Sequence, residues 1–146
     1  MKPSEVAKQY LGFEEKPANT GFKDAEFEKK MKAVGFESGH AWCAYFAELC
    51  FKEAYPEKKK ELDKLFSASA VQTFFNFQKA GYKVSSLPVA DSLVIWQNQK
   101  AGKPQWNGHA GIVSEVIDKI TFKSVEDNTN DDGSREGYEV ALKKRT

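Results

Sequence analysis

Residues 39–47 read GHAWCAYFA, and they place Cys43 where a loop becomes an amphipathic helix. The helix is predicted over residues 43–55, because Pro56 follows its end and its apolar side chains recur at helical spacing. A helix N-terminus carries unpaired N–H groups and a partial positive charge, which stabilise a thiolate and a developing oxyanion. Cys43 is therefore a candidate nucleophile. The alternative is a buried structural cysteine, an interpretation that suits Cys50 better because it lies two turns into the helix.

The two cysteines are not expected to pair. Cys43 and Cys50 are separated by roughly 10 Å along a helix axis. A disulfide needs Cα atoms within roughly 7 Å of each other. The sequence therefore predicts that both thiols are free, and that Cys43 is available for chemistry.

The rest of the chain divides into a helical half and a strand half. Helices are predicted over residues 4–10, 24–34 and 69–80, from apolar spacing, capping residues and terminal glycines. Strands are predicted over residues 92–96, 110–116, 120–125 and 138–142, and residues 97–108 are predicted to form a long hairpin loop. Helices followed by an antiparallel meander predict an α+β fold, with N-terminal helices packed on a C-terminal antiparallel sheet. We expect residues 1–146 to form a single domain.

Composition excludes several classes of protein. The 146 residues carry a net charge of +1, and 40% of them are hydrophobic, which supplies a core without disulfides or metals. A basic stripe for nucleic acid is missing, since glutamates flank the Lys58–Lys60 run and make it a solvated helix end. No apolar run reaches transmembrane length, and the N-terminus lacks a signal-peptide stretch. We expect no nucleic-acid partner, no membrane insertion, and synthesis in the cytoplasm without a signal peptide.

The chain has two histidines that could act as a base for the thiol. His109 opens the predicted strand GHAGIV, whereas His40 lies in the loop only three residues before Cys43. A histidine from a different element can approach the sulfur laterally, so His109 is the favoured base. The alternatives are a structural strand histidine for His109 and a loop or cleft-wall residue for His40.

Glu126 and Asn128 are candidates for the residue that orients the imidazole. The period of two in a strand places both side chains on one face, so both could point toward His109 on the neighbouring strand. Only one can accept from the ring N–H, and the other would line the cleft or order the loop. The alternative is ordinary turn chemistry at the end of a strand.

Three aromatic residues, Trp42, Tyr45 and Trp106, are predicted to contact the substrate, although aromatic residues more often belong to the core. No phosphate-binding loop is present, and no Cys/His cluster has the linear spacing of a zinc site. The sequence therefore predicts neither a cofactor nor a metal ion.

In this order the segments resemble the CHAP family (cysteine/histidine-dependent amidohydrolase/peptidase) of the papain-like NlpC clan. Two positions depart from the usual family pattern, because Ala90 and Asp127 stand where glycine is common. The segments that carry the resemblance are residues 42–46 (WCAYF), 67–70 (SASA), 88–96 (PVADSLVIW), 108–113 (GHAGIV), 126–130 (EDNTN) and 134–145 (SREGYEVALKKR).

The resemblance implies a papain-like CHAP fold and a catalytic role for four residues. Cys43 is implied to be the nucleophile, His109 the base, Glu126 the orienting residue and Asn128 an auxiliary polar group. Family members cleave amide bonds of bacterial peptidoglycan, as N-acetylmuramoyl-L-alanine amidases or as endopeptidases of the stem or cross-bridge peptides. The expected intermediate is a cysteine thioester.

The resemblance also implies where such an enzyme works and with what. It would act in the bacterial cell wall or periplasm, as a phage lysin, a virion-associated enzyme or an injected effector. Its partners would be peptidoglycan and a virion, holin or secretion-system delivery component, or a cognate inhibitor. The alternatives are a cysteine peptidase or deamidase acting on a protein, and a non-catalytic structural or virion member of the family.

Overall fold

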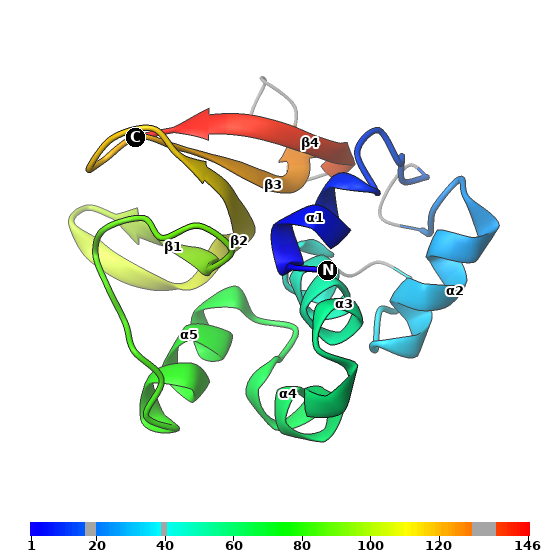
Figure 1. The fold of residues 1–146 in the computed structure, drawn as a ribbon, viewed down its shortest axis with the longest axis horizontal. Coiled ribbons are helices and arrows are strands. Elements are labelled where there is room, and N and C mark those ends of the chain that lie inside the picture. Colours follow the sequence, from blue (N-terminus) through cyan, green and yellow to red (C-terminus); the bar gives the residue numbers. More distant parts are fainter. Residues whose placement is uncertain (17–19, 39–40, 130–136) are drawn as a thin grey trace.

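The computed structural model describes residues 1–16, 20–38, 41–129 and 137–146, and in them five α-helices precede a four-stranded sheet (Figure 1). This order confirms the predicted α+β class. The helices are α1 (Pro3–Lys8), α2 (Ala25–Ala33), α3 (Cys43–Ala54), α4 (Lys59–Leu65, after the 3₁₀ turn Pro56–Lys58) and α5 (Ala70–Lys79). The strands are β1 (Leu93–Lys100), β2 (Lys103–Val116), β3 (Phe122–Thr129) and β4 (Gly137–Arg145).

Local sequence explains where the helices begin. The Asp24 carboxylate accepts from the N–H of Phe27 at 2.8 Å and caps α2. The Ser69 hydroxyl accepts from the N–H of Gln72 at 3.1 Å and caps α5. In the described residues, α3 has no such side-chain cap, so no capping side chain occupies the N–H groups of its first turn.

The central helix is α3, which contacts α1, α4, α5 and the strands β2 and β3. Its first eight residues, Cys43–Cys50, are all buried. Aromatic rings from the turn after α1, from α2 and from the loops before α2 and α3 pack edge to face around it, which fixes the direction of its N-terminus. This aromatic core contains Tyr10, Phe22, Phe27, Trp42 and Phe46.

The helix α4 was not predicted. The Lys58–Lys60 run is solvated, as expected, but it leads into α4 instead of ending a helix. Leu62 and Leu65 are the buried residues of this short element, and two apolar positions in seven residues are too few to show a period.

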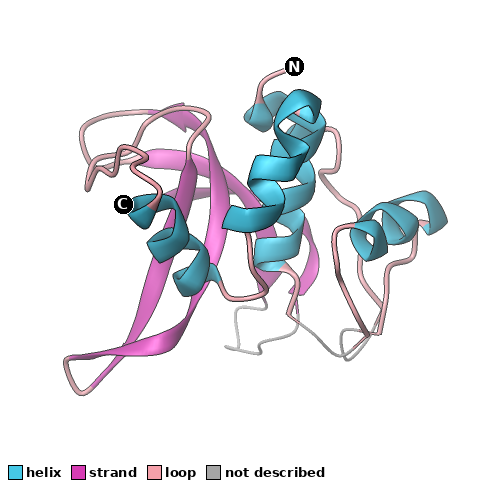
Figure 2. Ribbon diagram, turned by 90° about the horizontal axis from the view of Figure 1, so that it is seen from below, coloured by secondary structure: helices cyan, strands magenta, loops and turns pink. Residues whose placement is uncertain are grey.

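The sheet is antiparallel throughout, in the order β1-β2-β3-β4. Figure 2 shows α3 and α5 on one side of it. The apolar face that they cover includes Ile112, Val125 and Val140. Described helices include none long and apolar enough to cross a membrane.

The predicted long loop over residues 97–108 is wrong. Strand β1 runs on to Lys100, β2 begins at Lys103, and the two-residue turn Ala101-Gly102 joins them. Both turn residues have positive φ angles of 53° and 77°, as a tight hairpin requires. The tip of the hairpin is exposed, so backbone pairing forms it without the apolar alternation that identifies a half-buried strand.

Candidate active site

Cys43 is the first residue of α3 and is 9% exposed. Its side chain packs against Ala70 of α5 and Ala110 of β2, so three elements meet at the sulfur. The second thiol, Cys50, is completely buried in the aromatic core. Burial raises the pKa of Cys50 well above its ordinary value, which makes this thiol a poor nucleophile. Both thiols are free, as predicted.

His109 lies on β2, paired with Trp96 of β1. Its ring stacks on that of Trp96, with centroids 5.6 Å apart and planes inclined by 22°. The pairing of β2 with β3 ends at Ile112 and Val125, so His109 lies beyond the paired part of these two strands. The imidazole therefore fits between groups from both faces of the sheet. A ring nitrogen lies within 4.8 Å of the Cys43 sulfur on α3, and Nε2 hydrogen-bonds Glu126 on β3.

Glu126 holds the far side of the ring, where one carboxylate oxygen lies 2.9 Å from Nε2 of His109. The carboxylate is completely buried and is held by the guanidinium of Arg145, from Nε at 3.2 Å and from Nη2, and by the hydroxyl of Ser124. A Cβ atom at Gly111 would lie 3.5 Å from this carboxylate and 3.3 Å from the Glu126 Cβ, so glycine leaves the room that Glu126 occupies.

These contacts set the protonation of the pair. Burial opposes a charged His109, but hydrogen bonds to Cys43 and Glu126 and the charge of Asp127 raise its pKa to about 10. Burial likewise opposes a charged Glu126, but hydrogen bonds from His109, Arg145 and Ser124 lower its pKa to about 2. At neutral pH the imidazole is therefore protonated and Glu126 is ionised. Because Nε2 is hydrogen-bonded to Glu126, Nδ1 is the ring nitrogen that is left to exchange a proton with Cys43.

Asp127 is a further charged group of the site. Its Oδ1 lies 3.5 Å from Nδ1 of His109, and the side chain is only 6% exposed. The pKa of Asp127 is raised to about 6, because burial and the charge of the neighbouring Glu126 raise it more than the charge on His109 lowers it. The sulfur of Cys43, a ring nitrogen of His109 and an oxygen of Asp127 all lie within 4.8 Å of one another, so these three side chains could hold a metal ion.

A cysteine at a helix N-terminus, a histidine on a strand and a carboxylate on the next strand agree with the comparison to protein families. The model of the CHAP domain matches residues 35–128, which is more than half of the chain and includes Cys43, His109 and Glu126. The chain belongs to the CHAP domain family. Neither curated proteins nor solved structures gave a match.

CHAP domains are generally hydrolases or peptidases with peptidoglycan as substrate. Of the four predicted catalytic residues, the structure brings Cys43, His109 and Glu126 together. Asn128 is part of β3, but its side chain lies outside the described part of the structure. The rival base His40 also lies outside the described residues. The choice of Glu126 over Asn128 stays a prediction with a 2.9 Å contact in its favour.

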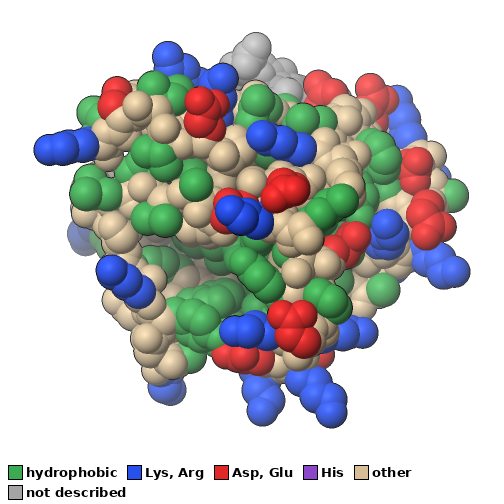
Figure 3. Space-filling view, in the orientation of Figure 1, with side chains coloured by type: hydrophobic (Ala, Val, Ile, Leu, Met, Phe, Trp, Pro, Cys, Tyr) green, Lys and Arg blue, Asp and Glu red, His purple; other side chains and the backbone are tan. Residues whose placement is uncertain are grey.

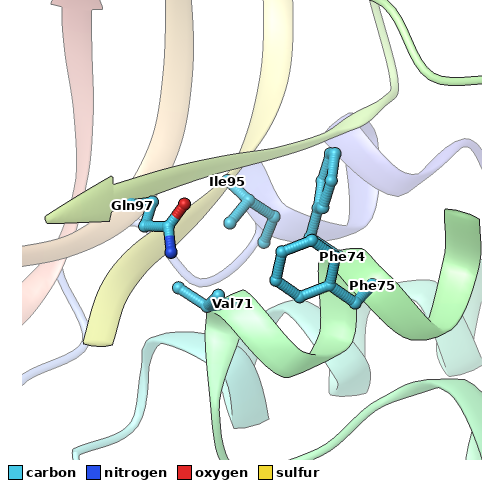
Figure 4. A pocket seen from close by; sticks show the side chains of 5 residues that line it. All are labelled: Val71, Phe74, Phe75, Ile95 and Gln97. Atoms are coloured by element: carbon cyan, nitrogen blue, oxygen red, sulfur yellow. The ribbon is translucent and has the colours of Figure 1, made fainter. Parts of the chain in front are cut away.

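A groove of about 710 Å³ lies between α5 and the β1–β2 hairpin. Its walls include Ser69 and Val71, the chain neighbours of the Ala70 that packs against Cys43, so the groove lies near this cysteine. A second hollow of about 220 Å³ shares Val71, and Figure 4 shows side chains of α5 and β1 around it. Its lining residues are Val71, Phe74, Phe75, Ile95 and Gln97.

The three predicted substrate-binding aromatics have different surroundings. Trp106 lines the groove and is 77% exposed, so it is available to a substrate. Trp42 is completely buried against Phe22, so its prediction as a contact residue is wrong because the ring has no free surface. Tyr45 is 7% exposed and packs against Phe36, which also makes it a core residue.

Sequence reasoning missed the residues that support this CHAP site. Arg145 was assigned only to a closing strand, and Trp96 only to an apolar one. The guanidinium of Arg145 lies 5.0 Å from the centre of the Trp96 ring, so both residues brace the pair of His109 and Glu126. The available signal was strand alternation, which places Ser124 on the same face as Glu126.

Figure 3 shows interspersed charges of both signs and no histidine on the face that it presents.

Proposed function

We propose that this CHAP domain hydrolyses an amide bond of bacterial peptidoglycan through a thioester on Cys43. The bond would be the N-acetylmuramoyl-L-alanine amide or a peptide bond of the stem or cross-bridge. The observation that supports this most directly is the contact of His109 with Cys43 on one side and with Glu126, at 2.9 Å, on the other. That arrangement provides a nucleophile, a proton carrier and an orienting group.

In the first half of the reaction the Cys43 thiolate attacks the carbonyl carbon and forms a carbon–sulfur bond. The carbonyl oxygen becomes an oxyanion, which N–H groups at the start of α3 are positioned to stabilise. His109 gives the proton on Nδ1 to the amide nitrogen, the carbon–nitrogen bond breaks, and the amine leaves. A ring with a pKa of about 10 holds that proton at neutral pH, so the acid for the leaving amine is in place before substrate binds.

In the second half, water replaces the amine. His109 takes a proton from the water as its oxygen attacks the thioester carbon, and the carbon–sulfur bond breaks. The carboxylic acid product leaves, and the thiolate–imidazolium pair forms again. Glu126 keeps its charge throughout, because Arg145 and Ser124 hold it ionised, and it stabilises the imidazolium in both halves.

The groove between α5 and the β1–β2 hairpin would bind the peptide part of the substrate. Its polar side chains, Gln72, Gln97 and Gln105, suit amide groups, and exposed Trp106 suits a sugar or an apolar side chain. The protein would act in the bacterial cell wall or periplasm. It would reach this substrate by lysis, within a virion or by injection, with a virion, holin or secretion-system component as delivery partner, or a cognate inhibitor as regulator.

Mass spectrometry of isolated sacculi after incubation with the purified protein tests the proposal. Soluble fragments with a new carboxyl or amine at one defined position are expected, and that position separates an amidase from an endopeptidase. Cys43→Ala should release none, whereas the matched variant Cys50→Ala should release them. Intact sacculi together with cleavage of a generic peptide amide would favour the rival, a protein-directed cysteine peptidase or deamidase. Activity in neither assay would favour the non-catalytic alternative.

A further inference from the structure

Beyond hydrolysis, the site contains three good metal ligands from three elements. They are the sulfur of Cys43 on α3, Nδ1 of His109 on β2 and Oδ1 of Asp127 on β3. Linear spacing did not reveal them, because 66 and 18 positions separate them along the chain. All three atoms lie within 4.8 Å of one another. Zinc in proteins prefers a small number of sulfur, nitrogen and oxygen ligands.

The distances suit tetrahedral coordination. With zinc–nitrogen and zinc–oxygen bonds of about 2.0–2.1 Å, tetrahedral ligands lie about 3.3 Å apart. The measured separation of Nδ1 of His109 and Oδ1 of Asp127 is 3.5 Å. Two of the ligands are thus already at coordination spacing, and the sulfur needs only a small side-chain movement.

Asp127 supplies the second, independent observation. Its Oδ1 is buried and has no hydrogen-bond partner among the described residues, although the whole side chain is only 6% exposed. A buried oxygen that lacks a hydrogen bond is costly, and native structures rarely retain one without a reason. The oxygen faces the ring nitrogen that serves Cys43. A cation bound between these groups would satisfy it.

The surroundings of His109 also fit a metal ligand. Histidines that bind zinc usually donate their other ring N–H to a carboxylate, which fixes the ring and makes it a stronger ligand. Glu126 accepts from Nε2 at 2.9 Å and is itself held by Arg145 and Ser124. The histidine therefore presents Nδ1 in a fixed direction.

We propose that Cys43, His109 and Asp127 form a zinc site that blocks the nucleophile reversibly. The Cys43 thiolate and the Asp127 carboxylate together balance the charge of Zn²⁺, and His109 binds as the neutral ring. Binding therefore releases to solvent the proton that His109 carries. Water or another small ligand takes the fourth position. The block of hydrolysis rests on the proposed function, whereas the binding itself does not.

The test measures alkylation of Cys43 by iodoacetamide at increasing free Zn²⁺, with mass spectrometry of the labelled protein. Zinc should protect Cys43 in the wild type, and Mg²⁺ should not, because it prefers oxygen ligands. Asp127→Asn and Asp127→Gly should each need at least roughly tenfold more zinc for the same protection, since even outer-shell changes cost about 10–100-fold in affinity. The matched control Cys50→Ala should behave like the wild type.

A second readout uses Co²⁺ in place of zinc. The wild type should show a thiolate-to-cobalt charge-transfer band and the intense visible bands of tetrahedral cobalt, and Asp127→Asn should need at least roughly tenfold more Co²⁺ to reach the same band intensity. Equal zinc protection of Cys43 in the wild type and in both Asp127 variants would overturn the proposal, and so would a lack of protection in the wild type. Neither measurement uses peptidoglycan, so a failure to digest sacculi leaves this test intact.

Discussion

Replacing Asp127 by asparagine should stabilise the protein at neutral pH and leave its stability nearly unchanged in acid. The Asp127 carboxylate is buried beside Glu126, and burial raises its pKa from 3.8 to about 6. The folded state therefore binds the proton more tightly than the unfolded state does. The stability contributed by that proton is fully present below pH 3.8 and is lost as pH rises to about 6.

The size of the effect follows from this shift. One pKa unit corresponds to about 1.4 kcal/mol, so a shift from 3.8 to about 6 corresponds to about 3 kcal/mol. Asparagine has nearly the same shape as the protonated acid and never ionises. Asp127→Asn should therefore unfold with a free energy about 3 kcal/mol higher than the wild type at pH 7.5, with the difference fading towards pH 4.

Urea unfolding of both proteins at pH 4, 5, 6 and 7.5, followed by tryptophan fluorescence, measures this difference. Glu115→Gln, which removes an exposed carboxylate, controls for the loss of one negative charge. A difference between wild type and Asp127→Asn that is the same at every pH would refute the reasoning. A less stable variant at pH 7.5 would also refute it, and would show that ionised Asp127 is held by favourable contacts.

The remaining predictions concern the catalytic groups and their support. Cys43→Ala should fold normally and lose essentially all hydrolysis, and iodoacetamide should label Cys43 much faster than buried Cys50, which peptide mass mapping measures. His109→Ala should reduce kcat at least roughly a hundredfold, as expected for a lost acid–base group, and a near-normal kcat would transfer the role elsewhere. Glu126→Gln should keep the ring oriented but lose the charge that stabilises the imidazolium, giving a partial loss of kcat, and an unchanged kcat would contradict this role. Arg145→Ala should lower the free energy of unfolding by about 1.5 kcal/mol at pH 7, the low end for a hydrogen bond to a charged group, since a third of the Arg145 side chain is exposed. That loss should fade as pH falls from 4.5 through about 2, where Glu126 becomes protonated, and a loss independent of pH would contradict it.

Local patterns were sufficient wherever one element decides the outcome. The apolar stripe of residues 43–54 predicted α3. The predicted helix, residues 43–55, has the observed start at Cys43 and differs from the observed end by one residue. Capping by Asp24 and Ser69 predicted the starts of α2 and α5. The helix α4 and the outer part of the β1–β2 hairpin were missed, because neither buries enough apolar side chains to leave a period in the sequence.

Contacts between elements needed the tertiary structure. Alternation in β3 grouped Glu126 with Asn128, yet the carboxylate that comes close to Nδ1 of His109 belongs to Asp127. The physical reason is the end of the β2–β3 pairing at Ile112 and Val125, beyond which the His109 ring reaches groups from both faces. The residues 108–113 alone do not show where the pairing of β2 with β3 ends.

The sequence by itself determined the α+β class, the family and the order of cysteine, histidine and carboxylate, because each depends on short segments with their own period or motif. Only the tertiary structure decided what holds Glu126 and what lies against the His109 ring. Arg145 reaches Glu126 from β4, and Asp127 reaches His109 with an oxygen that has no hydrogen-bond partner among the described residues. Both contacts join strands whose register and twist set the distances, and those are properties of the packed sheet as a whole.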